Sequence, residues 1–275
     1  MSSSAPVAVQ PVPRGGVGRI VGRRVVDWLP ALVVLVAALA MWQEAIDVFN
    51  VKKFLLPQPS TILSTFWRER HQFLSAGWLT LQEALGGFAI GCGLGILVAL
   101  ALARWRRVGS ALMPYAIAAN AVPIIAFAPI ADAWFSPFSK SSKMAIAAVL
   151  CFFPVLVNTL RGLTSVRPES IELMQSYAAS QVEIFRRVRI PTALPFLFTA
   201  LKISTVLAMI GAIVAQYFGG SFNDLGVLIQ SRSQTFAYDE AWAGIFVACL
   251  YGIAFYLAVA ALERLVLRWQ PSTSE

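Results

Sequence analysis

Long apolar stretches separated by short polar segments dominate the pattern of this chain. Six of them approach or exceed the roughly 20 residues that a helix needs to cross the hydrocarbon core of a membrane. They cover residues 28–46, 78–103, 110–135, 144–163, 193–218 and 241–262. The sequence therefore predicts an all-α membrane protein with six transmembrane helices. The third stretch carries Pro114, Pro123 and Pro129, so we expect that helix to be kinked or broken.

The second stretch contains a row of small residues. Its glycines are Gly86, Gly87, Gly91, Gly93 and Gly95. Two overlapping G-x-x-x-G patterns occur among them, and such faces let two membrane helices approach closely. We expect this helix to be tightly packed against a neighbour.

Composition agrees with a membrane protein. The chain is 58% hydrophobic and 13% charged, whereas a soluble domain carries roughly 25% charged residues. The net charge of +8 comes mostly from arginines at the ends of apolar stretches. Arginine in these places orients membrane proteins, so we expect no nucleic-acid partner.

The distribution of basic residues predicts the orientation. With six spans, one side carries Arg14, Arg19, Arg23, Arg24, Arg104, Arg106, Arg107, Arg161, Arg167, Arg186, Arg187, Arg189, Arg264 and Arg268. The other side carries Lys52, Lys53, Arg68, Arg70, Lys140, Lys143 and Arg232. Because the richer side is cytoplasmic, both termini are expected in the cytoplasm. Residues 1–27 form a basic, Ser/Pro/Gly-rich tail expected to be disordered, residues 28–265 the membrane domain, and residues 266–275 a second cytoplasmic tail.

A polar, Arg-rich segment over residues 166–195 separates the fourth and fifth stretches. Pro168 suits the first turn of a helix, followed by Glu169 and Glu172. Ser180 and Glu183 have the spacing of a capping box that opens a second helix. The elbow between the two helices is Tyr177-Ala178-Ala179. We expect a cytoplasmic hairpin, with proline stops at Pro191 and Pro195, that serves as a docking surface.

Several side chains inside the predicted spans are candidates for lining a translocation pathway, because polar groups there usually face the bundle or a cavity. The polar candidates are Asn120, Asp132, Asn158 and Gln216. The aromatic candidates, which could stack on a flat ring, are Trp134, Phe152, Phe153 and Tyr217. The alternatives are that the amides join helices and that the rings face lipid or pack. Lys202 could bind an anion, snorkel or pair with an acid.

No pattern of metal ligands or disulfides stands out. The cysteines, Cys92, Cys151 and Cys249, each lie in an apolar stretch without a C-x-x-C pair and are expected to be small buried side chains. His71 has no cluster of His, Cys or carboxylates around it. We expect no metal site.

At residues 166–195 the chain resembles the permease subunit of bacterial ABC importers, the binding-protein-dependent transport family. That family carries a Glu-Ala-Ala sequence, a glycine, then an isoleucine and a Leu-Pro. The matching positions are Glu172, Ala178 in place of the glycine, Val188, Ile190 and Pro191, with Leu173 and Met174 in place of the alanines. Glycine permits a left-handed backbone that alanine resists. Either the elbow at Ala178 is less sharp, or packing holds the strain.

The resemblance implies a type I importer permease in the bacterial inner membrane, paired with a second copy, two ATPase subunits and an extracytoplasmic binding protein. The chain has no G-x-x-x-x-G-K-S/T motif, so ATP and magnesium would be bound by the separate ATPase and this chain is not an enzyme. The hairpin, residues 164–192, would couple the ATPase to this chain. The coupling residues implied are Glu172, Ser176, Tyr177, Ala178, Ala179, Arg186, Arg187 and Pro191.

Within the family the chain looks like the branch that imports taurine, sulfonates, nitrate, thiamine precursors and riboflavin. This is suggested by L-P-Q-P-S at residues 56–60 and F-F-P-V-L-V-N-T at residues 152–159. The second segment is most similar to members that handle vitamins or heterocyclic precursors, such as riboflavin, a thiamine precursor or a pyrimidine-like compound. Sulfonate, taurine or nitrate import by the same machinery is the alternative.

Two other classes of function predict features that differ from these. An ion-coupled secondary transporter predicts a carboxylate in the middle of a span, but the candidates Asp132 and Glu83 both read as near a span end. A membrane-embedded enzyme needs a His/Asp or paired-carboxylate constellation inside the membrane, and the sequence has none.

Overall fold

Helices form all the regular secondary structure in the described part of the chain, as the apolar pattern predicts. The computed structural model describes residues 17–49, 56–105, 109, 111, 114–115, 117–118 and 124–268. Backbone contacts divide the chain into two units, Met1–Ser60 and Thr61–Glu275, which are described separately. By length and composition, five helical segments of the described residues could cross a membrane: Leu29–Val48, Arg70–Arg104, Lys140–Thr164, Gln181–Phe218 and Tyr238–Val266.

The first unit contains α1 (Val17–Val48). Most of its apolar side chains from Leu29 onward, such as Leu32 and Val34, are exposed, which suits a helix surrounded by lipid, whereas Ile46 near its end is buried. Near its end, the Gln43 side chain donates to the Ser60 hydroxyl oxygen at 3.1 Å and accepts from the Ser60 backbone N–H at 3.3 Å. α1 includes the first predicted span, residues 28–46, but it begins earlier, at Val17. The expectation of a disordered tail over residues 1–27 is therefore wrong for residues 17–27, which are helical.

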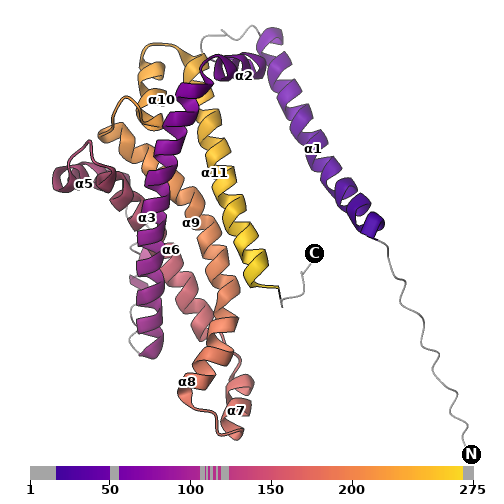
Figure 1. Cartoon of the computed structure of the whole chain (residues 1–275), viewed down its shortest axis with the longest axis vertical. Coiled ribbons are helices and arrows are strands. Elements are labelled where there is room, and N and C mark those ends of the chain that lie inside the picture. The colour runs from indigo at the N-terminus through magenta and orange to yellow at the C-terminus, as the bar shows by residue number, and fades with distance from the viewer. Residues whose placement is uncertain are drawn as a thin grey trace, which may run out of the picture. The chain divides into compact units, whose positions relative to one another are not determined.

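The second unit is built around four long helices. They are α3 (Arg70–Arg104), α6 (Lys140–Thr164), α9 (Ile190–Phe218) and α11 (Tyr238–Val266). In Figure 1 they run side by side, with α3 packed on α6 and α6 on α9. The short helices α7 (Pro168–Ser176) and α8 (Gln181–Ile184) lie at one end of this bundle, and α10 (Leu225–Gln234) lies at the other. A further short helix, α2 (Pro59–Arg68), precedes α3.

The predicted close packing of the glycine row of α3 is confirmed for Gly86, Gly87, Gly91 and Gly95, which lie against α6. A Cβ added to Gly91 would collide with the backbone of Ala148, and one added to Gly95 would lie 2.9 Å from the carbonyl oxygen of Phe152. Gly93 points away, with nothing within 4 Å of an added Cβ. Backbones can approach this closely only where side chains are absent, so Gly87, Gly91 and Gly95 determine how α3 and α6 meet.

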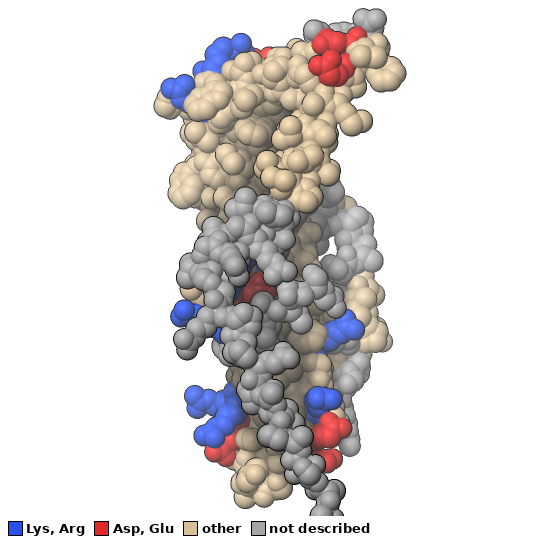
Figure 2. All heavy atoms as spheres, turned by 90° about the vertical axis from the view of Figure 1, so that its right-hand side faces the viewer, with Lys and Arg blue, Asp and Glu red and all other residues tan. Residues whose placement is uncertain are grey.

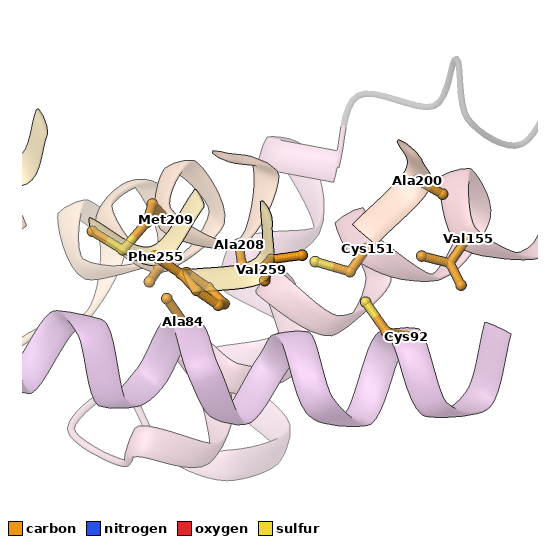
Figure 3. Packing of buried hydrophobic residues seen from close by; sticks show 10 residues of the cluster. Ala84, Cys92, Cys151, Val155, Ala200, Ala208, Met209, Phe255 and Val259 are labelled. Atoms are coloured by element: carbon orange, nitrogen blue, oxygen red, sulfur yellow. The ribbon is translucent and has the colours of Figure 1, made fainter. Parts of the chain in front are cut away.

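The core of the bundle collects small side chains from all four long helices. Figure 3 shows the side chains of Cys92 of α3 and Cys151 of α6 next to each other, with the Cys92 sulfur atom directed toward Cys151. Both thiols are buried, and the Cys151 thiol donates to the backbone oxygen of Ser204 on α9 at 3.3 Å. The expectation of buried cysteines is confirmed for these two. It is wrong for Cys249 on α11, which is exposed and lines an open cleft between α9 and α11.

Nine residues of the third predicted span, residues 110–135, lie outside the described residues, and all of them precede Ile124. Its described end consists of a single 3₁₀ turn, Ile124–Phe127, followed by α5 (Ala128–Phe135). Pro129 lies in the first turn of α5, where a proline is tolerated. The candidate pathway residue Asn120 is also outside the described residues.

Candidate functional site

The most distinctive surface of the second unit is the hairpin formed by α7 and α8. Arg167 has an extended backbone as the N-cap of α7, Pro168 follows in the first turn, and Glu169 adds negative charge there. These features fit the start of a helix, because proline lacks the N–H that would be unpaired and acids complement the helix dipole. All side chains of α7 are at least partly exposed. The predicted helix start is confirmed.

The elbow is a tight helix C-terminus closed by backbone hydrogen bonds. The Ala178 N–H donates to Gln175 O at 2.9 Å, and the Ala179 N–H donates to Met174 O at 3.0 Å. This pair of bonds is the Schellman pattern, in which the residue after the cap adopts a left-handed backbone. Ala178 does so, with φ of 53°. The elbow is therefore as sharp as one built with glycine, and the alanine carries the backbone strain.

The second helix of the hairpin opens with the predicted capping box. The Ser180 hydroxyl oxygen accepts from the Glu183 N–H at 3.3 Å, and the Glu183 carboxylate accepts from the Ser180 N–H at 2.9 Å. The reciprocal bonds satisfy two backbone donors that a helix start leaves free. This cap fixes the direction of α8 immediately after the elbow.

The tip of the hairpin exposes apolar side chains. Tyr177 is 77% exposed, and Leu173 and Val182 beside it are also exposed. Tyr177 belongs to the predicted tip, but sequence reasoning missed Leu173 and Val182 as part of the same surface. Figure 2 shows acidic and basic side chains interspersed at this end of the molecule. An exposed apolar patch with a charged rim is typical of a protein docking surface.

The predicted charged residues lie on α7 and on the segment that follows α8. Glu172, Arg186 and Arg187 are exposed, and none of the ion pairs between described side chains involves them. These three exposed side chains are therefore available to bind a partner protein. A cleft of about 620 Å³ lies between the end of α3 and the hairpin, lined in part by Arg104, Gln181 and Arg189.

The hairpin is anchored in the bundle by its second helix. Ile184 is 1% exposed, and Phe185 packs on a buried apolar cluster. The cluster contains Ala99, Ala103, Leu156, Leu160, Leu163 and Ala193. Sequence reasoning missed both anchors, because a single apolar residue in a polar segment carries no periodic signal.

The predicted proline stop at Pro191 is wrong, because the chain continues as helix from α8 into α9. A π-helical segment, Phe185–Arg189, joins them, and the Ile190 N–H donates to Phe185 O five residues back. The wider turn accommodates Pro191 in the first turn of α9, while the Thr192 hydroxyl donates to Val188 O at 2.7 Å. Pro195 likewise lies inside α9 rather than before it. The hairpin is therefore connected to α9 by continuous helix.

The pathway candidates are spread over three helices. On α5, Asp132 is buried and accepts a hydrogen bond from the Ser142 hydroxyl, whereas Trp134 is exposed and contacts Phe127 edge to face with ring centroids 5.5 Å apart. On α6, Phe152 and Phe153 form an edge-to-face pair at 5.0 Å. Asn158 donates to Pro154 O of its own helix at 2.8 Å. These contacts do not gather the side chains into one cavity.

The two candidates on α9 have different surroundings. Gln216 is 1% exposed and hydrogen-bonded to α3 and α10. Tyr217 is half-exposed and lines an apolar cleft of about 460 Å³ between α9 and α11, together with Tyr256 and the exposed Cys249. Lys202, further along α9, forms an ion pair with Glu263 of α11 at 2.7 Å. The pairing alternative for Lys202 is confirmed.

The described helices, five of them long and apolar enough to cross a membrane, define a helical membrane protein, and comparison with known proteins places the chain in a family. Residues 91–270 match the family described as binding-protein-dependent transport system inner membrane component. The riboflavin transport system permease protein of Chloroflexus aurantiacus is 32% identical over 255 residues, covering 90% of this chain and 92% of that protein. The formylaminopyrimidine transport permease protein of Halalkalibacterium halodurans is 32% identical, covering 84% of this chain and 92% of that protein.

The chain belongs to this family and is the inner-membrane permease subunit of an ABC importer, a non-enzymatic subunit whose ATPase is a separate protein. Family membership implies an ATPase and a substrate-binding protein as partners. The matched relatives also include permeases named for aliphatic sulfonates, taurine and nitrate. A solved structure of an amino acid ABC transporter with histidines shares the fold, with a TM-score of 0.58 at 21% identity over 76% of this chain and 98% of that chain.

Proposed function

We propose that two copies of this chain form the translocation pathway of an importer driven by two copies of an ABC ATPase. Each copy crosses the membrane six times, with the third helix over residues 110–135 and both termini in the cytoplasm. The ATPase holds ATP and magnesium, and this chain binds no cofactor. An extracytoplasmic binding protein delivers the solute. The arginine distribution and the five apolar helices support this arrangement.

The α7–α8 hairpin carries the proposal as the coupling element. Its exposed apolar tip at Leu173, Tyr177 and Val182 suits a groove on the ATPase. Glu172, Arg186 and Arg187 are exposed on the same hairpin and its connection to α9, and they suit a polar rim, because rim charges orient a partner. The continuous helix from α8 through Pro191 into α9 gives the tip a stiff connection to a membrane span. Movement of the tip by the ATPase is therefore transmitted along α9.

The proposed solute is a vitamin or heterocyclic precursor, such as riboflavin, a thiamine precursor or a pyrimidine-like compound. Two permeases at 32% identity, named for riboflavin and formylaminopyrimidine, support this class. In the pathway, Tyr217 is the aromatic candidate that lines a cleft, and aromatic faces suit a flat ring. The further pathway candidates are Asn120, Asp132, Trp134, Phe152, Phe153, Asn158 and Gln216.

Tyr177→Asp, compared with Tyr177→Phe, tests the coupling role. A charge at the centre of an apolar contact loses several kcal/mol of docking energy, whereas the phenyl ring of the Phe variant keeps the contact area. We expect Tyr177→Asp to abolish ATP-dependent uptake by the reconstituted transporter and to weaken co-purification of the ATPase, while Tyr177→Phe keeps both. The side chain is exposed, so both variants should fold. Uptake by Tyr177→Asp at the wild-type rate would contradict the role of the hairpin.

Uptake of labelled solutes by cells that express the complete transporter tests the substrate class. We expect saturable uptake of riboflavin or formylaminopyrimidine that requires the ATPase. Uptake of taurine, an alkanesulfonate or nitrate instead would identify the alternative branch. Uptake by the permease alone, driven by a proton or sodium gradient without ATP, would show a secondary transporter and overturn the proposal.

A further inference from the structure

A buried polar cluster joins three helices at the end of the bundle opposite the hairpin. It contains Thr80 and Glu83 of α3, Gln216 of α9, and the backbone N–H groups of Leu225 and Gly226 at the start of α10. Glu83 is 2% exposed and Gln216 is 1% exposed. Polar groups buried this deeply cost free energy unless each is hydrogen-bonded. The pattern of their bonds therefore constrains how the three helices fit together.

The Gln216 amide is held in one orientation by groups on either side. Its nitrogen donates to a Glu83 carboxylate oxygen at 2.6 Å and to the Thr80 hydroxyl oxygen at 3.0 Å. Its oxygen accepts from the Gly226 N–H at 2.8 Å. If the amide were reversed, its oxygen would face the carboxylate and its N–H groups would face another N–H. Glu83 thus directs the amide oxygen toward α10.

Thr80 completes the arrangement with no unused hydrogen-bonding capacity. Its hydroxyl donates to Ala76 O at 3.1 Å and accepts from both the Gln216 amide and the Leu225 N–H, the latter at 3.3 Å. The first N–H groups of a helix have no partner within the helix. Side chains of α3 and α9 satisfy two of those groups in α10, so the seating of α10 depends on both spans at once.

α10 is a separate piece of helix held at its two ends. A Cβ added to Gly226 would lie 2.6 Å from Ile213 O and 2.9 Å from the Gln216 Cβ, so the start of α10 lies directly on α9. At the other end, Arg232 pairs with Glu240 of α11 at 2.9 Å. The chain reverses on both sides of α10, after Gly219-Gly220 and at Phe236, whose φ is 61°.

We propose that Glu83 is a positioning residue that, through Gln216, keeps α10 seated on the bundle, and that α10 leaves this seat when α3 and α9 shift during transport. The proposal rests on the proposed function, in which this end of the bundle faces the binding protein. A shift between α3 and α9 separates Glu83 from Gln216, frees the amide to turn, and removes the acceptor from the Gly226 N–H. Glu83 therefore links the arrangement of the spans to the position of α10.

Two variants, Glu83→Leu and Glu83→Gln, test the link between Glu83 and the position of α10. Each variant is assembled with the ATPase in lipid nanodiscs and compared with the wild-type complex. We expect the Leu225 and Gly226 amides to exchange with solvent about tenfold faster in Glu83→Leu, the effect of losing one buried hydrogen bond. Glu83→Gln retains an oxygen that can accept from Gln216, so exchange should stay within about twofold of wild type. We also expect Glu83→Leu, and not Glu83→Gln, to raise ATP hydrolysis in the absence of the binding protein.

Thr205→Val is the matched control. Thr205 is a fully buried hydroxyl on α9 that donates only within its own helix, to Lys202 O at 2.8 Å. The Thr205→Val variant should have a lower melting temperature, but hydrogen exchange at the Leu225 and Gly226 amides should be unchanged. If Glu83→Leu does not fold, Thr80→Val compared with Thr80→Ser tests the same step at the Leu225 amide.

Two results would overturn the inference. One is wild-type exchange at Leu225 and Gly226 in Glu83→Leu, and the other is an equal increase in Glu83→Leu and Thr205→Val. A failure of the proposed function gives a different result, since the wild-type complex would then show no ATP-dependent uptake whatever the exchange rates in α10.

Discussion

Replacing Ala178 with glycine tests whether the hairpin elbow stores backbone strain. Ala178 has φ of 53°, and a left-handed backbone costs an L-residue roughly 1–2 kcal/mol, whereas glycine adopts it freely. Glycine loses more entropy on folding, by roughly 0.4–1 kcal/mol relative to alanine. The difference favours Ala178→Gly by about 0.5–1 kcal/mol. This corresponds to a change of roughly twofold to fivefold in the equilibrium for opening the elbow.

Amide hydrogen exchange at the elbow measures this equilibrium directly. The N–H groups of residues 178 and 179 donate to Gln175 O and Met174 O at 2.9 and 3.0 Å, and these bonds break when the elbow opens. We expect both amides to exchange roughly twofold to fivefold more slowly in Ala178→Gly. Ala179→Gly is the control, because Ala179 is not among the residues with positive φ. Glycine there adds only its entropic cost and should speed exchange.

The two glycine variants are expected to change the exchange rate in opposite directions, although the substituted positions are adjacent. If Ala178→Gly speeds exchange as Ala179→Gly does, then packing of the Ala178 methyl group outweighs the backbone strain, and the reasoning is refuted. ATP-dependent uptake should remain in Ala178→Gly, because glycine keeps the left-handed turn.

Two further predictions concern the packing of the bundle. Gly91→Ala should destabilise the protein by about 1–3 kcal/mol, because the new methyl group meets the backbone of Ala148. In Gly93→Ala the new methyl group meets nothing within 4 Å, so this variant should instead be stabilised by roughly 0.5–1 kcal/mol. Thermal unfolding in detergent distinguishes the two variants. Equal shifts of the melting temperature would contradict the packing described. Lys202→Met should cost about 1–3 kcal/mol, less than for a fully buried pair, since the two side chains are 24% and 21% exposed. The double variant Lys202→Met with Glu263→Leu should recover much of this loss in the same assay, and no recovery would exclude an unpaired Glu263 as the cause.

The sequence by itself determined the features that depend on neighbouring residues. The first turn at Pro168 and the capping box of Ser180 and Glu183 are present as predicted, because these interactions span only three or four residues. The apolar stretches likewise predicted long helices, since length and composition decide whether a segment suits a membrane. The left-handed conformation of Ala178 was one of two possibilities, and the Schellman bonds decided between them.

Local rules failed where a distortion of the backbone compensates for them. Pro191 and Pro195 predicted the end of a helix, since proline lacks the N–H that continues the hydrogen-bonding pattern. The π-helical segment before Pro191 widens the turn, and the helix continues into the span. A sequence pattern does not reveal such a segment, because its residues are ordinary and its stability depends on anchors such as Ile184 and Phe185.

Only the tertiary structure decided which side chains meet across the bundle. Gln216 stands 136 residues from Thr80 and 133 from Glu83 along the chain, yet its amide contacts both. Apolar periodicity shows which face of each helix is buried, but the vertical register between helices depends on contacts such as Gly91 against Ala148. The glycine row lets α3 approach α6 closely at one position along the helix axes. That position places Glu83 beside Gln216 and the start of α10. The partners of these buried polar groups therefore follow from packing.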